Sequence, residues 1–224
     1  MFKSLLGFWK GKDFLAKVFE EFNGMLGDSK EMFIAVCNGL FEDVDKAGLK
    51  KEIYETDKRI NMLQKDIRKR IVEHLALQPT VDVTACLLLM SVVKDAERLG
   101  DYAKNLYEVA VLLDEPIDRA LFTEYFNQID KDILGLFEQT RDAFVRADEA
   151  KAKLAWSYEK GIAKECDRIV ERAAHSDLPV NQAVCFALLA RHFKRIMAHL
   201  VNIATSVILP LSELDYFDER TVND

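Results

Sequence analysis

The chain has 224 residues, half of them hydrophobic, which is enough to bury one large core or two small ones. Its net charge of −7 argues against a nucleic-acid-binding protein, because such proteins normally present a basic face to phosphates. Only 9 glycines and 4 prolines interrupt stretches rich in Leu, Ala, Glu and Lys, and no sustained alternation of apolar and polar residues indicates a strand. The sequence therefore predicts an all-α protein.

The spacing of apolar residues predicts six long helices, near residues 12–43, 47–77, 80–112, 117–146, 149–174 and 178–208. Pro79 and Asp82 mark the start of the third helix, and Asp114 to Pro116 separate the two halves. Long helices that are joined by short turns lie antiparallel, so each half forms a three-helix bundle. We expect a first domain over 1–114, a second over 115–210, and a tail over 211–224.

In the first helix, two glycines leave its continuity open. Gly24 and Gly27 precede Asp28, which has the sequence context of an N-cap with an acidic residue three positions later. The chain therefore either bends here within one helix or breaks and begins a second one.

Residues 1–12, MFKSLLGFWKGK, mix aromatic and aliphatic side chains with three lysines. Two interpretations stay open: a short anchor at a membrane surface, or a tail whose rings dock on the bundle or on a second subunit. We favour the tail. No apolar run reaches the roughly 18 residues that a membrane span needs, and no signal-peptide pattern is present. We expect a cytoplasmic protein with at most peripheral membrane association.

The four cysteines occur singly in helical stretches, without CxxC spacing. They are Cys37, Cys86, Cys166 and Cys185. This distribution is typical of reduced, buried thiols and not of a disulfide framework.

One stripe of polar residues suggests chemistry. Glu97, Asp101 and Asn105 are four residues apart and therefore share one face of the third helix. Their oxygens are hard ligands, suited to Mg, Ca, Mn or Fe. The neighbouring second helix offers Asp57 and Asn61, again four apart, and bundles generally hold metal clusters with carboxylates from facing helices.

An ordinary solvated face explains the same spacing. Lys94, Arg98 and Lys104 are close enough in sequence to form simple ion pairs with these acids. From the spacing alone, this second interpretation is the stronger one.

The two halves share a weak internal similarity. The segment ERLGDYAKNL (97–106) aligns with KRIMAHLVNI (194–203), with an arginine, an aliphatic residue and an asparagine in common. Both segments fall at the same place in the third helix of their half, which indicates a duplication.

Three motifs in the first half carry a resemblance to a known family. They are DKRINML (57–63), QPTVD (78–82) and DAERLGDYAKN (95–105). In this order they resemble the PhoU family of phosphate-signalling proteins, and the similarity extends over the whole chain as two three-helix repeats.

The resemblance implies a metal site, because the family's acidic motifs on paired helices are its proposed ligands. The matching positions are Glu97, Asp101 and Asn105, with Asp57 and Asn61 opposite. The implied cofactor is a hard divalent or trivalent ion: Fe, Mn, Mg or Ca.

The second half departs from the family pattern. Lys194 stands where the motif has Glu, and Ala198 stands where it has Asp, although Asn202 is retained. Since a lysine repels a metal cation, we predict a metal site in the first repeat only and a salt bridge in the second. The lysine could pair with Glu159 or Glu165. The helix-five equivalent of Asp57 stays open among Glu159, Glu165 and Asp167.

Three histidines near this region offer an alternative ligand set: His175, His192 and His199. Lone histidines on helix faces and at helix ends are more often structural or solvated, so we favour that interpretation over metal ligation.

The resemblance implies a regulator that binds a phosphate transporter subunit and a sensor histidine kinase, and we expect a homodimer. Catalysis finds little support, since the chain has no GxSxG, no HExxH and no phosphate-cradling Gly-rich loop. The alternatives are a metal-dependent helical enzyme or metal-storage bundle, and a metal-free adaptor of another phosphate transporter.

Overall fold

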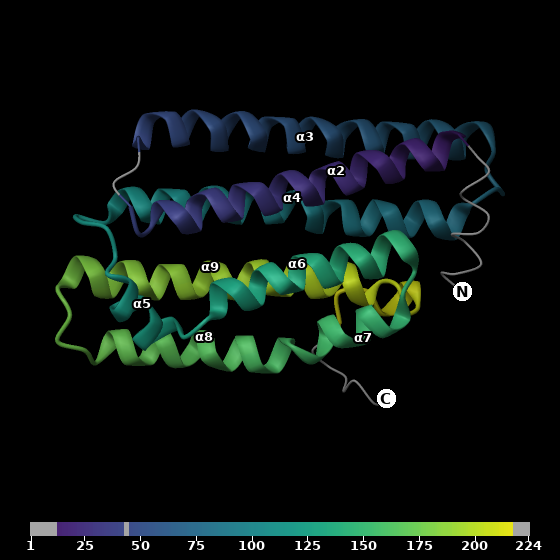
Figure 1. Ribbon diagram of the computed structural model, residues 1–224. Helices are drawn as coiled ribbons and strands as arrows, with labels where there is room; N and C mark the ends of the chain where they lie inside the picture. Colours follow the sequence, from purple (N-terminus) through teal and green to yellow (C-terminus); the bar gives the residue numbers. More distant parts are fainter. Residues whose placement is uncertain (1–12, 43–44, 217–224) are drawn as a thin grey trace.

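The computed structural model describes residues 13–42 and 45–216, and no strand occurs in these ranges (Figure 1). This confirms the all-α prediction. The helices are α2 (Asp13–Gly39), α3 (Lys46–Leu77), α4 (Val83–Leu112), α5 (Arg119–Phe126), α6 (Ile129–Arg146), α7 (Glu149–Ser157), α8 (Glu159–Ala174) and α9 (Val180–Thr205), followed by the 3₁₀ turn η1 (Leu211–Glu213).

Helices α2, α3 and α4, here called the first repeat, pack against one another (Figure 1). Apolar residues at helical spacing on α3, such as Ile60 and Ile67, are buried. Phe22 and Phe33 of α2 are also fully buried, and their rings contact Phe144 and Phe137 of α6. Gly24 and Gly27 do not break α2, which continues through both. Asp28 therefore lies inside the helix, where it accepts hydrogen bonds from Arg59 Nε (2.6 Å) and Nη2 (2.7 Å) of α3.

The remaining helices, α5 to α9, form the second repeat, and here two of the expected helices are interrupted. The helix expected over 117–146 breaks at Asn127, which has a φ of 53° and a ψ of −114°. Asparagine tolerates positive φ better than most residues, so it can end α5 and turn the chain into α6. The helix expected over 149–174 is divided at Tyr158, next to Ser157, whose Oγ donates to the Leu154 carbonyl at 2.7 Å.

The two repeats meet along α4 and α9, which lie side by side and run antiparallel (Figure 1). Leu99 at the middle of α4 and Ile196 at the middle of α9 are fully buried. Helices α2 and α6 also touch. One continuous apolar core therefore runs through both repeats.

A glycine sets the close approach of α3 and α4. A Cβ added at Gly100 would lie 2.9 Å from Ile60 Cδ1, which is closer than real Cβ contacts. In the alignment of the two repeats, Met197 occupies the corresponding place in α9. The first repeat thus brings its second and third helices together where the acidic stripe lies.

All four cysteines are free and buried, as predicted. Burial raises the pKa of the Cys86 thiol to about 11 and that of Cys166 to about 12. Neutral thiols of this kind are poor nucleophiles and poor metal ligands.

The segment predicted to dock or to anchor, residues 1–12, lies outside the described residues. Among the helices that are described, none combines the length and the apolar character that crossing a bilayer requires.

Candidate functional site

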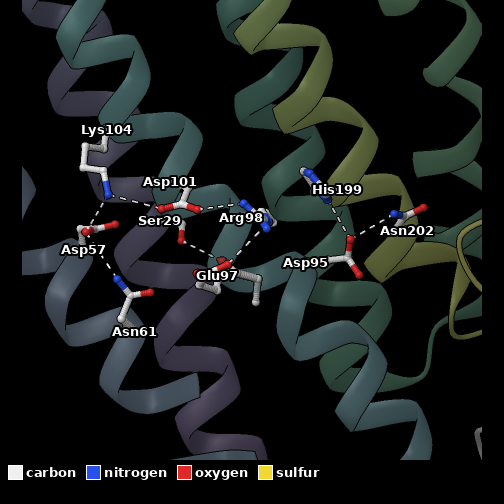
Figure 2. Close-up of polar contacts among 11 residues, drawn as sticks. Ser29, Asp57, Asn61, Asp95, Glu97, Arg98, Asp101, Lys104, His199 and Asn202 are labelled. Carbon is white, nitrogen blue, oxygen red and sulfur yellow. Dashed lines mark hydrogen bonds and ion pairs between the residues drawn. The ribbon is translucent and has the colours of Figure 1, made fainter. Parts of the chain in front are cut away.

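The acidic stripe of α4 faces α3, as the helical spacing predicts (Figure 2). Asp57 of α3 is largely buried and lies close to Asn61, whose Nδ2 is 3.5 Å from Asp57 Oδ2. Asp101 of α4 approaches the same region from the other helix (Figure 2). We call Asp57, Glu97 and Asp101 the acidic cluster.

Lys104 of α4 connects the two helices. Its Nζ donates to Asp57 Oδ2 at 2.9 Å and to Asp101 Oδ1 at 3.3 Å (Figure 2). Burial by itself lowers the pKa of this amine, but the hydrogen bonds and charges of the two aspartates outweigh it, so that the pKa of Lys104 is raised. The lysine therefore stays charged between two carboxylates from different helices.

Glu97 belongs to the cluster through its charge and not through a hydrogen bond in the described part of the chain. Its Oε2 lies 3.9 Å from Arg98 Nε, and Arg98 Nη1 also donates to Asp101 Oδ2 at 3.3 Å. Burial raises the pKa of Glu97, and the charge of Asp101 adds to this effect. Asn105, the last residue of the stripe, is half-buried, and its side chain makes no hydrogen bond to the described residues.

The donor chemistry suits a hard metal ion, but the arrangement fits an ammonium group. In residues 13–42 and 45–216, no three His, Cys, Asp or Glu side chains come close enough together to hold a metal. Lys104 Nζ is instead placed between the oxygens of Asp57 and Asp101. With this side chain in place the residues do not fit a metal ion. The metal site of the first repeat stays a prediction.

The salt bridge predicted for the second repeat is confirmed, with a different partner. Lys194 Nζ donates to both carboxylate oxygens of Asp167, at 2.8 and 2.6 Å. Arg191 Nη1 lies 3.9 Å from the same carboxylate. Glu165, one of the expected partners of Lys194, forms its ion pair with Arg168 instead, whose Nε is 2.9 Å from Glu165 Oε2. Of the three candidates for the equivalent of Asp57, Asp167 of α8 is thus the one that contacts the degenerate motif.

A polar contact that the sequence analysis missed joins the two repeats. Asp95 of α4 is 1% exposed, and its Oδ1 lies 2.8 Å from His199 Nδ1 and accepts from Asn202 Nδ2 at 3.1 Å (Figure 2). We call these three residues the repeat junction. Its Asp95 Oδ2 and Asn202 Oδ1 are buried and have no hydrogen-bond partner among the described residues.

A signal for the repeat junction exists in the sequence. Asp95 follows Leu88 and Val92 and precedes Leu99 at the helical spacing of the core face, and these three apolar residues are buried. A carboxylate on an apolar face needs a partner from another element. The partner comes from the second repeat.

The histidines considered as metal ligands have other roles in the structure. His199 contacts Asp95, and its ring also stacks on Tyr102, with centroids 5.5 Å apart. The His192 ring also contacts Tyr102, with ring centroids 5.9 Å apart, and burial lowers the pKa of this histidine. His175 Nδ1 lies 2.9 Å from the Glu171 carbonyl oxygen near the end of α8. Tyr102 and His199 occupy corresponding positions in the aligned segments of the two repeats.

Comparisons with known proteins concern the family and the fold of the chain. The PhoU domain family model matches residues 22–110 and 126–207. The phosphate-specific transport system accessory protein PhoU homologue of Caulobacter vibrioides is 24% identical over 201 residues, which is 87% of each chain. The homologue of Aquifex aeolicus is 26% identical over 197 residues, which is 80% of this chain and 86% of the relative.

Two solved structures share the fold. The crystal structure of PhoU from Pseudomonas aeruginosa has a TM-score of 0.77 at 24% identity and covers 93% of this chain and 98% of its own. The phosphate transport system regulatory protein PhoU from Streptococcus pneumoniae has a TM-score of 0.71 at 18% identity, covering 95% and 100%.

Proposed function

Because the chain belongs to the PhoU family, we propose that it is a cytoplasmic regulator of phosphate uptake and of phosphate-starvation signalling. In this proposal it binds a phosphate transporter subunit and a sensor histidine kinase, acts as a homodimer and catalyses no reaction. The observation that carries the proposal is the family match over both repeats, together with relatives that are named as accessory proteins of the phosphate-specific transport system.

One end of the molecule has the chemistry of a partner surface. Exposed apolar side chains gather where α4 ends and α9 begins, and the Asn181 side chain ties these ends together by donating to the Leu112 carbonyl at 2.7 Å. The exposed residues are Val111, Leu112, Val180 and Val184. We call these four the end patch.

Acidic residues border the end patch. A hollow of about 400 Å³ next to it is lined by Asp114, Glu115 and Asp118, and no basic residue of the described chain lines it. Cytoplasmic loops of membrane proteins carry an excess of Lys and Arg. An apolar surface with an acidic border therefore suits a basic, amphipathic loop of a transporter.

The test is recovery of partners from cells that are grown in high and in low phosphate. A phosphate transporter component should be recovered together with the tagged chain. Leu112→Arg should lower the recovered amount by at least about tenfold, because it removes apolar contact and adds a positive charge that repels a basic partner. Leu77→Arg is the matched control, since Leu77 is an exposed leucine at the last position of α3, and α3 ends at the opposite end of the molecule from the end of α4 (Figure 1). Failure to recover any transporter or kinase component would overturn the proposal.

A further inference from the structure

The acidic cluster has a cation that the chain itself supplies. We propose that Lys104 is the resident counterion of this cluster, that it takes the place expected for a metal ion, and that divalent cations bind there only when this side chain is removed. The proposal concerns the chemistry of the site and does not depend on which proteins the chain binds.

Geometry gives Lys104 the role of a bridging ion. Its Nζ contacts one oxygen from α3, Asp57 Oδ2, and one from α4, Asp101 Oδ1. Asn61 Nδ2 approaches the same Asp57 oxygen at 3.5 Å. A metal ion shared by the two helices would use these same oxygens, at roughly 2.0–2.6 Å. The ammonium group and the metal therefore compete for one place.

The local charge balance favours the lysine. The acidic cluster carries three negative charges, while Lys104 and Arg98 bring two positive charges into contact with it. Asp57 and Lys104 have side chains that are only 11% and 21% exposed, so solvent screens their charges weakly. A divalent ion that entered beside Lys104 would meet a repelling charge and at most one uncompensated carboxylate.

The second repeat reaches charge balance in the same way. Lys194, which corresponds to Glu97 in the duplicated segment, donates to Asp167 of the preceding helix. Each repeat thus joins its last two long helices by a lysine–carboxylate contact. The lysines come from different positions, Lys104 and Lys194, so one pairing is not a copy of the other.

The experiment is a titration with Mn²⁺ of the full chain, purified in the presence of a chelator that is then removed. Bound metal is measured by equilibrium dialysis, and the melting temperature is followed at each Mn²⁺ concentration. We expect no saturable binding to the wild type. Lys104→Gln should melt at a lower temperature without metal, should bind Mn²⁺ at least about tenfold more tightly than the wild type, and should regain melting temperature on binding.

Two further variants locate the effect. Asp101→Asn in the Lys104→Gln background should abolish the Mn²⁺ response, because it removes one of the two carboxylates that face each other. Lys194→Gln is the matched control, since it frees a single, 58% exposed carboxylate at Asp167, which cannot chelate a metal ion. This control should show no response to Mn²⁺.

The proposal is overturned if the wild type binds stoichiometric Mn²⁺ and loses it on Asp101→Asn. It is equally overturned if Lys104→Gln is folded and binds no more tightly than the wild type. If Lys104→Gln is too unstable to purify, Lys104→Arg is tested in its place, because it keeps the positive charge. Absence of Mn²⁺ binding to Lys104→Arg supports the proposal of a resident cation, and stoichiometric Mn²⁺ binding to this variant refutes the proposal.

Discussion

The α3–α4 face of the first repeat and the α8–α9 face of the second contain the same kind of ion pair in different surroundings. In the first repeat, Lys104 lies between two carboxylates, and the Asp57 side chain is 11% exposed. In the second, Lys194 and Arg191 both approach one carboxylate, Asp167, which is 58% exposed. Each repeat therefore has its own lysine–carboxylate contact, and of these two contacts only the one in the first repeat combines burial with a second carboxylate.

The surroundings of each ion pair decide how much it contributes to stability. An exposed pair is screened by water and contributes little, whereas removing one partner of a buried pair leaves the other desolvated and uncompensated. Corresponding substitutions in the two repeats should therefore change stability by unequal amounts.

The largest effect on stability should come from replacing Gly100 with methionine, the residue at the corresponding position 197 of the second repeat. Gly100→Met places the residue found at position 197 against Ile60, where even a Cβ would be 2.9 Å from Cδ1. Overpacking should lower the free energy of unfolding by about 3 kcal/mol, measured by urea denaturation. The control Met197→Leu conserves volume and should cost less than about 1.5 kcal/mol. A Gly100→Met chain as stable as the wild type would show that α3 and α4 are not closely packed.

Removal of the bridging charge should have the next largest effect. Lys104→Met leaves Asp57 and Asp101 facing each other without a cation, and it should lower the free energy of unfolding by about 2 kcal/mol. Chemical denaturation in chelator-treated buffer measures this. Lys104→Arg, which keeps the charge, should lose less than half as much, and equal losses in the two variants would contradict the electrostatic account.

The next effect in size is a pH-dependent contribution of Glu97 to the stability of the folded chain. Burial raises the pKa of its carboxyl in the folded state, so the folded chain holds this proton more tightly than the unfolded chain. The contribution of Glu97 to stability is therefore largest at low pH and falls as pH rises from the ordinary carboxyl pKa through the raised one. Glu97→Gln has no such loss, and at about pH 7 it should be more stable than the wild type by less than about 1 kcal/mol.

Thermal melts at several pH values test this prediction. The advantage of Glu97→Gln should disappear at about pH 3, where the wild-type carboxyl is protonated in both states. An advantage that does not change with pH would mean that packing, and not the charge of Glu97, is responsible.

The smallest effect should be found in the second repeat. Lys194→Met removes a pair whose carboxylate is mostly solvated, and it should change the free energy of unfolding by less than about 0.5 kcal/mol. The same denaturation series at low and high salt should show that even this difference shrinks with ionic strength. A loss as large as that of Lys104→Met would erase the contrast between the repeats.

Helical periodicity in the sequence was enough to predict the all-α architecture and the shared face of Asp57, Asn61 and the α4 stripe. It could not predict the break at Asn127, because a positive φ leaves no trace in apolar spacing. It also placed Lys104 near the acids without revealing that its amine reaches Asp57, 47 residues away, since this depends on the register of α3 against α4.

The hydrogen-bond partners of Asp95 could not be predicted from the sequence either, because they also depend on how two helices pack. His199 and Asn202 lie 104 and 107 residues away in the sequence, on a helix of the other repeat. The apolar stripe shows that Asp95 is buried, but only the packing of α4 on α9 shows with what.

The repeat junction makes the two halves of the duplicated chain depend on each other. A separated first repeat would have to expose the apolar side of α4 and leave Asp95 without His199 and Asn202, while a separated second repeat would have no carboxylate for its histidine. An ancestral single repeat must have satisfied this surface in another way, for instance by pairing with its own copy. Once Asp95 in one half and His199 in the other had come to depend on each other, neither half could be lost or exchanged without the other.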